Sequence, residues 1–336
     1  MNQMTEVTQS HTASFGSEQT LGSPELAAFW QGIDSDFLKL DDKLHLAYMS
    51  ISHPQSKGTL VISNGRVESY VKYQELIFDC YRQGYSIYAL DHRGQGLSSR
   101  LTSNPHKGHV EHFDDYVNDL ALFIDLVVLP AQTPGTALFL IGHSMGSAIA
   151  TLYLERHPGV FKAAVLCAPM YGIQLPMGKG FIRWLANKLD GVRQNGEPSY
   201  VPRGKDYVAV PFAENELTHS EIRYQAYRRL YQTQPELQLG APTNHWLVQA
   251  IDAGDRCIRA ARQSKTPILI LQASEDTVVD NAAQNLAIGP NCRLLTIEGA
   301  RHEIFIESDK IRDLALEALF DFLKCHAPMN TRAIDA

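Results

Sequence analysis

The pentapeptide at residues 142–146, Gly-His-Ser-Met-Gly, places a serine hydroxyl where it could act as a nucleophile. An apolar run at residues 137–141 precedes it, and a helix-like run follows it directly. In such a strand–turn–helix setting the central serine sits on a sharp turn, with its Oγ exposed above the end of a buried strand. The two flanking glycines fit this turn because larger side chains would collide with the strand and the helix. We therefore predict that Ser144 is a catalytic nucleophile.

A serine hydroxyl is a weak nucleophile at neutral pH, so it needs a base, and the base needs an acid that holds its tautomer. In this arrangement the chain order is serine, acid, histidine. The acid is expected in the loop at residues 274–279, which follows a late apolar run. We predict Asp276 for this role. Glu275 is the rival, because one position changes the direction of a side chain, and both carboxylates could instead be ordinary loop residues.

The base is expected in a loop after the last strand. Among the thirteen histidines, His302 has this placement, just after the apolar run at residues 294–297. Negative charge that develops on the substrate oxygen needs two N–H donors. One predicted donor is the backbone amide of Met145, directly after the nucleophile. The other is the amide of Arg66, in a glycine-containing turn after an early strand.

The segments that must position these residues alternate between strand-like and helix-like patterns. This alternation predicts a mostly parallel sheet flanked by helices on both faces. The pattern breaks at about residue 171 and resumes at residue 267, with prolines interrupting helix-like stretches in between. An insertion at this edge of a sheet is where a ligand-covering cap would lie. Strands are expected at residues 43–51, 58–63, 85–90, 137–141, 163–167, 267–273 and 292–297, and helices at 70–83, 113–129 and 309–323.

The expected organisation is a mobile N-terminal arm (residues 1–23), an α/β core (24–170 and 263–326) and a helical cap (171–262). The arm has no apolar segment of the kind that a secretory signal carries, and no apolar run approaches the ~20 residues that cross a bilayer. Five cysteines without a C-x-x-C pair favour a reducing compartment. We expect a cytoplasmic protein, with peripheral contact at the inner membrane where its substrate requires it.

Composition excludes several other classes of protein. The net charge of −7 argues against a nucleic-acid partner, because such proteins usually carry a basic excess. The G-x-G at residues 94–96 lacks the third glycine and the lysine of phosphate-binding loops, so a structural turn is the expected role. The histidines at positions 106, 109 and 112 could hold a metal, but without an H-E-x-x-H pattern we expect packing instead. We therefore predict no metal and no organic cofactor. The sequence does not indicate an oligomeric state.

With these residues in view, the chain resembles the α/β hydrolases, and more narrowly the bacterial lysophospholipase L2 group, close relatives of the monoacylglycerol lipases. The resemblance covers nearly the whole chain after the arm. In the wider lipase group the oxyanion turn often reads His-Gly, whereas here it reads Asn64-Gly65, in agreement with the lysophospholipase branch. The most specific stretches are residues 65–73, 91–96, 105–110, 113–117 and, in the insertion, 217–220.

The resemblance implies hydrolysis of the single acyl ester of a lysophospholipid, without metal or cofactor. Three alternatives stay open: a monoacylglycerol lipase or general carboxylesterase with the same residues, a catalytically silent fold used for binding, and a cofactor-free perhydrolase. In the cap, Arg223, Arg228 and Arg229 lie on one predicted helix and could pair with a phosphate, although a solvated helical face would look the same. Three cap aromatics are expected beside the acyl chain: Phe181, Trp184 and Trp246.

Overall fold

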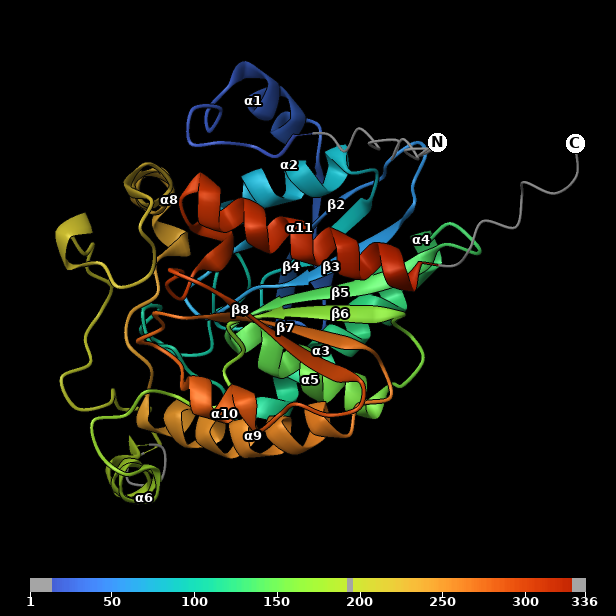
Figure 1. Cartoon of the computed structure of the whole chain (residues 1–336). Helices are drawn as coiled ribbons and strands as arrows, with labels where there is room; N and C mark the ends of the chain where they lie inside the picture. Colours follow the sequence, from blue (N-terminus) through green and yellow to red (C-terminus); the bar gives the residue numbers. More distant parts are fainter. Residues whose placement is uncertain (1–13, 192–195, 328–336) are drawn as a thin grey trace, which may run out of the picture.

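A single eight-stranded sheet runs through the centre of the protein (Figure 1), as seen in a computed structural model that describes residues 14–191 and 196–327. Its strand order is β1-β2-β4-β3-β5-β6-β7-β8. The pairs from β4 through β3 to β8 are parallel, whereas β2 pairs antiparallel with both β1 and β4. The strands are β1 (Asp34–Lys39), β2 (His45–Ile51), β3 (Gly58–Ser63), β4 (Ser86–Leu90), β5 (Ala137–His143), β6 (Ala163–Cys167), β7 (Ile268–Ala273) and β8 (Cys292–Ile297).

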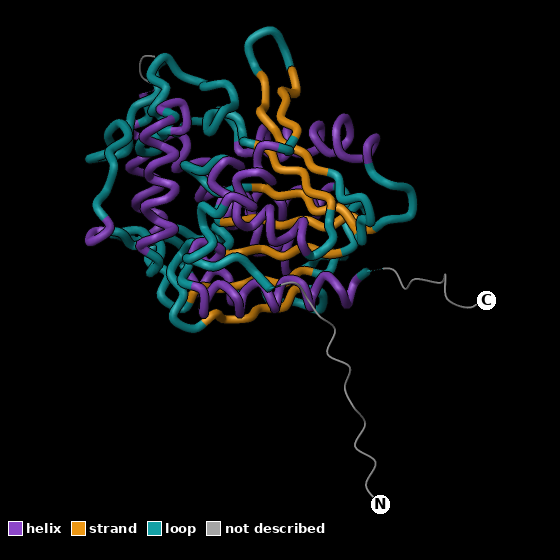
Figure 2. The backbone as a smooth tube through the Cα atoms, turned by 90° about the horizontal axis from the view of Figure 1, so that it is seen from above, coloured by secondary structure: helices purple, strands orange, loops and turns teal. Residues whose placement is uncertain are grey.

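Helices cover both faces of this sheet (Figures 1 and 2). α2 and α11 lie on one face, and α3, α5, α9 and α10 lie on the other. The helices are α1 (Pro24–Gln31), α2 (Gln74–Arg82), α3 (Phe113–Phe123), α4 (Leu129–Ala131), α5 (Met145–Arg156), α6 (Lys179–Leu189), α8 (Glu221–Thr233), α9 (Asn244–Arg262), α10 (Asn281–Asn285) and α11 (Asp309–His326). Short 3-10 turns occur at Tyr70–Tyr73, Phe212–Glu214, Pro235–Leu237 and Ile304–Ile306, and a π turn occurs at Ile124–Val128.

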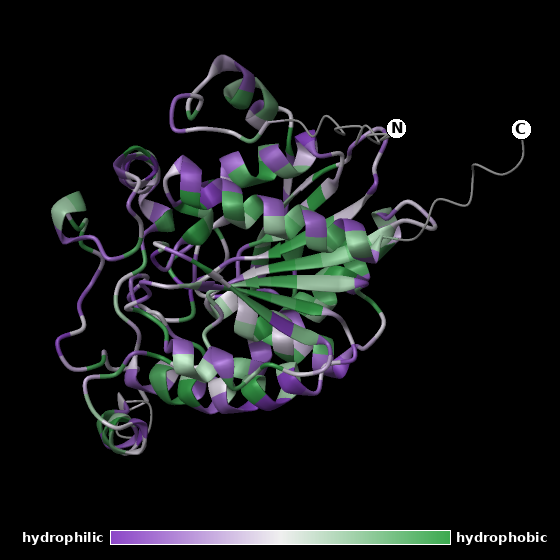
Figure 3. Ribbon diagram, in the orientation of Figure 1, coloured by the Kyte–Doolittle hydropathy of each residue, from purple (hydrophilic) through white to green (hydrophobic). Residues whose placement is uncertain are grey.

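Burial follows from this layering. Every residue of β3, β4, β5, β6 and β7 is buried, because helices remove both faces of these strands from water. The strands are correspondingly apolar, while the helices turn polar residues outward (Figure 3). β1 is almost wholly exposed, and with β2 it forms the hairpin that projects from the body in Figure 2. No helix of the described part of the chain is long and apolar enough to cross a bilayer.

The predicted cap boundary at residue 262 needs correction. α9, the last part of the predicted insertion, packs along α5, and its Trp246 and Cys257 belong to the hydrophobic core on that face of the sheet. Its apolar stripe therefore covers the α/β core. The segment that lies beyond the sheet edge is the part before α9, which includes α6 and α8 (Figure 1).

The predicted mobile arm, residues 1–23, is described only from residue 14 onward. This described part lies against the body. The Gly16 amide donates to Asp79 Oδ1 at 2.7 Å, and Phe15 stacks on Phe320 with ring centroids 5.7 Å apart. The expectation of a mobile arm is therefore wrong for these residues, since a buried hydrogen bond and an aromatic contact hold them. The rest of the arm lies outside the described residues.

Candidate active site

Ser144 sits on the turn between β5 and α5, as its sequence setting predicts. Its backbone has φ 49° and ψ −114°, in the left-handed half of conformational space that non-glycine residues rarely adopt. A Cβ at Gly142 would lie 2.7 Å from the Ser147 Cα, and a Cβ at Gly146 would strike the carbonyl oxygens of Ser63 and Asn64. The two glycines therefore allow helix, strand and neighbouring loop to close tightly around a strained serine.

His302 and Asp276 meet this serine. His302 Nε2 lies 3.0 Å from Ser144 Oγ, and His302 Nδ1 lies 2.8 Å from Asp276 Oδ2. All three side chains are buried. The second carboxylate oxygen of Asp276 accepts hydrogen bonds from the amides of Val278 and Val279. Burial alone would raise the pKa of Asp276, but the hydrogen bonds from His302 and from these amides lower it, so the carboxylate is ionised at neutral pH.

Glu275, the rival acid, points elsewhere. Its Oε2 lies 3.3 Å from His219 Nε2, and the side chain is about half exposed, at 53%. Both carboxylates follow β7, but the one-residue offset sends only Asp276 into the buried site beside His302. The structure thus brings His302 and Asp276 together with Ser144 and places the Glu275 carboxylate beside His219 instead.

The two predicted oxyanion amides come from segments that touch each other. Met145 is the first residue of α5, where backbone N–H groups have no partner within the helix. Arg66 lies in the loop after β3, and the hydroxyl of Ser63, the last residue of β3, donates to the Gly146 carbonyl at 3.0 Å. Gln95 fixes the turn by donating to the Gly65 carbonyl at 2.7 Å. Met145 directly follows the nucleophile, and Arg66 lines the same pocket as Ser144.

A buried ionic network that the sequence analysis did not predict lies next to the site. Glu68 accepts hydrogen bonds from Lys72 (3.0 Å) and pairs with His143 Nδ1 (2.9 Å), while Lys72 also reaches Glu303 at 2.6 Å. Burial opposes charge on both Glu68 and His143, but their mutual attraction outweighs it: the pKa of Glu68 is held well below its usual range and that of His143 is raised. His143 Nε2 donates to the His302 carbonyl at 3.2 Å, so the network holds the backbone of the predicted base.

Two signals could have revealed this network. Glu68 and Lys72 are four residues apart within the stretch at residues 65–73, a spacing that suits an ion pair on a helical turn. His143 is an ionisable residue within the nucleophile pentapeptide, directly before Ser144. Neither signal says that the two segments meet, because β3 and β5 must first be placed side by side.

A pocket of about 390 Å³ opens onto Ser144 and His302, and we call it the serine pocket. Its walls are mostly apolar and come from the core and from the predicted cap. Of the six cap residues expected to contact substrate, the serine pocket includes Arg228 and Trp246. Its apolar walls are formed by Met170, Ile173, Leu217, Pro242, Trp246, Leu247, Val278 and Val279.

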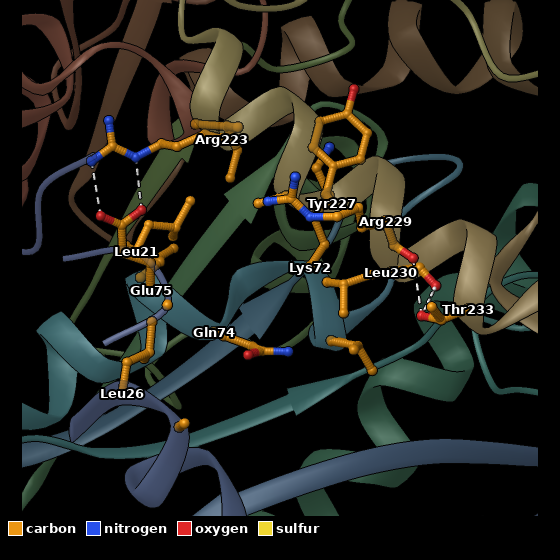
Figure 4. A pocket seen from close by; sticks show the side chains of 16 residues that line it. Leu21, Leu26, Lys72, Gln74, Glu75, Arg223, Tyr227, Arg229, Leu230 and Thr233 are labelled. Carbon is orange, nitrogen blue, oxygen red and sulfur yellow. Dashed lines mark hydrogen bonds and ion pairs between the residues drawn. The ribbon is translucent and has the colours of Figure 1, made fainter. Parts of the chain in front are cut away.

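Arg223 and Arg229 lie outside the serine pocket, so the expectation that they bind the phosphate of the substrate is wrong. Arg223 is buried, and its guanidinium makes a two-pronged pair with Glu75 at 2.7 and 2.8 Å. Arg229 is exposed beside a second pocket, between the N-terminal segment, α2 and α8 (Figure 4). Adjacent helical residues point about 100° apart, so arginines at positions 223, 228 and 229 of α8 face three different directions.

Phe181 and Trp184 also lie outside the serine pocket. They are 49% and 55% exposed on α6, with ring centroids 5.7 Å apart. α6 packs against α9 with its other side, so this pair of rings faces away from the body. The expectation that Phe181 and Trp184 flank a buried acyl chain is therefore wrong, whereas Trp246 lines the serine pocket.

The sheet order, with a serine on the turn after β5, an acid after β7 and a histidine after β8, defines an α/β hydrolase. Among solved structures, a soluble variant of monoglyceride lipase from Saccharomyces cerevisiae matches with a TM-score of 0.70 at 20% identity, covering 88% of this chain and 96% of that one. Residues 54–309 match the family described as serine aminopeptidase, S33.

Relatives at higher identity narrow this class. The chain is 39% identical over 321 residues to lysophospholipase L2 of Escherichia coli (strain K12), covering 92% of this chain and 93% of that protein. It is 36% identical to the probable lysophospholipase L2 of Haemophilus influenzae, covering 89% and 95%. Human monoglyceride lipase is more distant, at 26% identity over 76% of this chain and 78% of that protein. The chain belongs to the lysophospholipase L2 family of α/β hydrolases.

Proposed function

We propose that this protein hydrolyses the acyl ester of lysophospholipids, releasing a fatty acid and a glycerophospho-alcohol. The main support is that Ser144 and His302 line a mostly apolar pocket and are hydrogen-bonded to each other, with Asp276 hydrogen-bonded to His302. An ester carbonyl must lie against the serine, and an acyl chain is the part of a substrate that apolar walls would stabilise. The two similar lysophospholipase L2 proteins support the choice of lipid.

The proposed reaction follows from the geometry. Ser144 Oγ attacks the ester carbonyl carbon while His302 Nε2 takes its proton. Asp276 accepts the Nδ1–H of His302, fixes its tautomer and stabilises the imidazolium. The amides of Met145 and Arg66 donate hydrogen bonds to the oxyanion. His302 then gives its proton to the departing glycerol oxygen and activates a water that releases the fatty acid from Ser144.

A substrate panel tests this proposal. The purified protein is assayed on a lysophosphatidylcholine, a monoacylglycerol and a p-nitrophenyl ester with the same acyl chain. We expect the highest kcat/KM on the lysophospholipid, because that substrate alone offers a phosphodiester to the positively charged side chains of the serine pocket. A higher kcat/KM on the monoacylglycerol would instead make this protein a monoacylglycerol lipase, the activity named for its more distant relatives.

We further propose that α6 contacts the membrane that supplies the lipid. Phe181, Trp184 and Leu189 (40%) of α6 are exposed, as is Met177 (50%) just before the helix, so this segment presents large apolar groups to solvent. Aromatic side chains of this kind insert into the boundary between head groups and acyl chains. The helix is anchored to the body by the ion pairs of Lys179 with Asp255 and of Arg183 with Asp252.

Replacing Phe181 and Trp184 together by serine should therefore reduce co-sedimentation with phospholipid vesicles. Hydrolysis of a short-chain ester in free solution should be preserved, because neither ring lines the serine pocket. Leu126→Ser is the matched control, since it removes an equally exposed apolar side chain (59%) from the turn after α3. Equal vesicle binding by the double variant and the control would remove α6 from the proposed membrane contact.

A further inference from the structure

Three cationic side chains line the serine pocket, and they differ in how their charge is balanced. Lys72 is fully neutralised, with Glu68 at 3.0 Å and Glu303 at 2.6 Å. Arg228 has no carboxylate partner among the described residues and its Nε is also without a hydrogen-bond partner, but it donates to two tyrosine hydroxyls and lies across three tyrosine rings of the cap. Arg66 is the third cation, and no carboxylate of the described residues forms an ion pair with it.

The Arg66 guanidinium is held by neutral groups only. Its Nη2 donates to the Gly240 carbonyl, and its Cζ lies 5.3 Å from the centroid of the Trp246 ring. Its Nε is buried and has no hydrogen-bond partner in the described structure. Burial lowers the pKa of Arg66 to about 10, so the side chain is still charged at neutral pH. A buried donor on a charged group without an acceptor is costly, and an anionic ligand would remove that cost.

The surrounding backbone is built to leave room for this guanidinium. A Cβ at Gly108 would collide with the Arg66 Nη2 and would lie 3.0 Å from Nε. Gly108 is fixed in this place by hydrogen bonds to the cap, from its own amide to the Ala241 carbonyl at 3.1 Å and from the Thr243 amide to its carbonyl at 2.8 Å. A side chain at position 108 would therefore displace the Arg66 guanidinium from its place between the core loop and the cap.

We propose that the Arg66 guanidinium binds the phosphodiester of the lysophospholipid head group, an inference that rests on the proposed function. The planar fork of an arginine suits bidentate contact with phosphate oxygens. In arginine, a chain of covalent bonds joins the backbone amide nitrogen to the guanidinium carbon. In a 1-acyl lysophospholipid, a chain with the same number of bonds joins the ester carbonyl carbon to the phosphorus. Arg66 thus spans from the oxyanion, which meets its amide, to the phosphate, which meets its side chain.

The test compares wild type with Arg66→Met, Arg66→Lys and Gly108→Ala. The substrates are octanoyl lysophosphatidylcholine and monooctanoylglycerol, both below their micelle-forming concentrations. Loss of a hydrogen-bonded charge at the phosphate should lower the ratio of kcat/KM on the first to kcat/KM on the second by about 10- to 100-fold in Arg66→Met, through KM. Arg66→Lys should retain part of this ratio. Gly108→Ala should lower it too, by displacing the guanidinium while Arg66 itself stays intact.

Arg293→Met is the matched control, because it removes one positive charge from an exposed position on β8. It should leave the ratio unchanged. An unchanged ratio in all three test variants would overturn the Arg66 assignment and leave the proposed lysophospholipase activity standing. If Arg66→Met does not fold, Gly108→Ala and Arg66→Lys carry the same comparison.

A second readout separates this inference from the proposed function. Glycerophosphocholine, which carries the phosphodiester without an acyl chain, should inhibit monooctanoylglycerol hydrolysis competitively in the wild type. Its inhibition constant should rise at least about 10-fold in Arg66→Met. If wild type cleaves no lysophospholipid, the proposed function fails, and this measurement alone then decides: inhibition that depends on Arg66 upholds the phosphate site, and inhibition that is absent or independent of Arg66 overturns it.

Discussion

Ser144→Ala is expected to lower kcat for ester hydrolysis by about 10⁴- to 10⁶-fold, while the protein stays folded. The reason is that Ser144 Oγ is the atom that His302 can deprotonate, at 3.0 Å, and it alone of the described hydroxyls is placed so. Alanine keeps the Cβ and therefore the strained backbone at φ 49°, and it fits the space of the serine, so the fold should not change. Turnover of a p-nitrophenyl ester and covalent labelling by a fluorophosphonate probe measure the effect.

Ser147→Ala is the matched control for this variant. Ser147 is also buried on α5, but its hydroxyl donates to the Cys167 carbonyl at 3.3 Å and does not contact His302. It should label and turn over like wild type. Labelling and hydrolysis that survive in Ser144→Ala, with wild-type circular dichroism, would show that another residue is the nucleophile.

The parts of the site that the sequence predicts are those fixed by short-range geometry. A strand followed by Gly-x-Ser-x-Gly and a helix leaves the backbone few ways to turn, so the position of Ser144 is set locally. The acid and the base follow strands of a parallel sheet, whose carboxyl ends lie on one edge. The sequence therefore predicts that Asp276 and His302 approach Ser144, although they are far apart in the chain.

The parts that the sequence does not predict depend on rotation and on long-range packing. Arg228 and Arg229 are neighbours in sequence, yet one lines the serine pocket and the other lies outside it, because the rotation of α8 against the core decides which side faces inward. β1 carries too little apolar pattern to be recognised as a strand, since almost all of it is exposed. Phe181 and Trp184 look like ordinary core aromatics in sequence, but the face that packs against α9 is set only by the fold.

Arg66 shows how these two levels combine. Its backbone position follows from the turn after β3, which is a local feature. Its side chain depends on Gly108 and on Trp246 of α9, two segments distant in the chain. The fold must first bring these segments together. Only then can one see that Arg66 has no carboxylate beside it in the described structure. In sequence Arg66 looks like one of many surface arginines, but the fold places it in the serine pocket without a carboxylate partner among the described residues.

Asp276→Asn is expected to lower kcat by about 10⁴-fold with KM little changed. The Asp276 carboxylate can only accept the Nδ1–H of His302, which leaves Nε2 free to take the proton of Ser144. An asparagine can instead present its NH₂ group to Nδ1, which moves the ring proton to Nε2 and removes the base. The negative charge that stabilises the imidazolium is lost as well. Steady-state turnover of a p-nitrophenyl ester measures the change.

Glu275→Gln is the matched control for Asp276→Asn, because it removes one negative charge from the neighbouring residue. Its carboxylate contacts the partly exposed His219 and not His302, so kcat should stay within a few-fold of wild type. Because both side chains follow the same strand, a general loss of negative charge near the site would affect both variants alike. A large loss in Glu275→Gln together with near-normal turnover in Asp276→Asn would transfer the role of the acid to Glu275. The 2.8 Å contact between His302 Nδ1 and Asp276 predicts the opposite ranking.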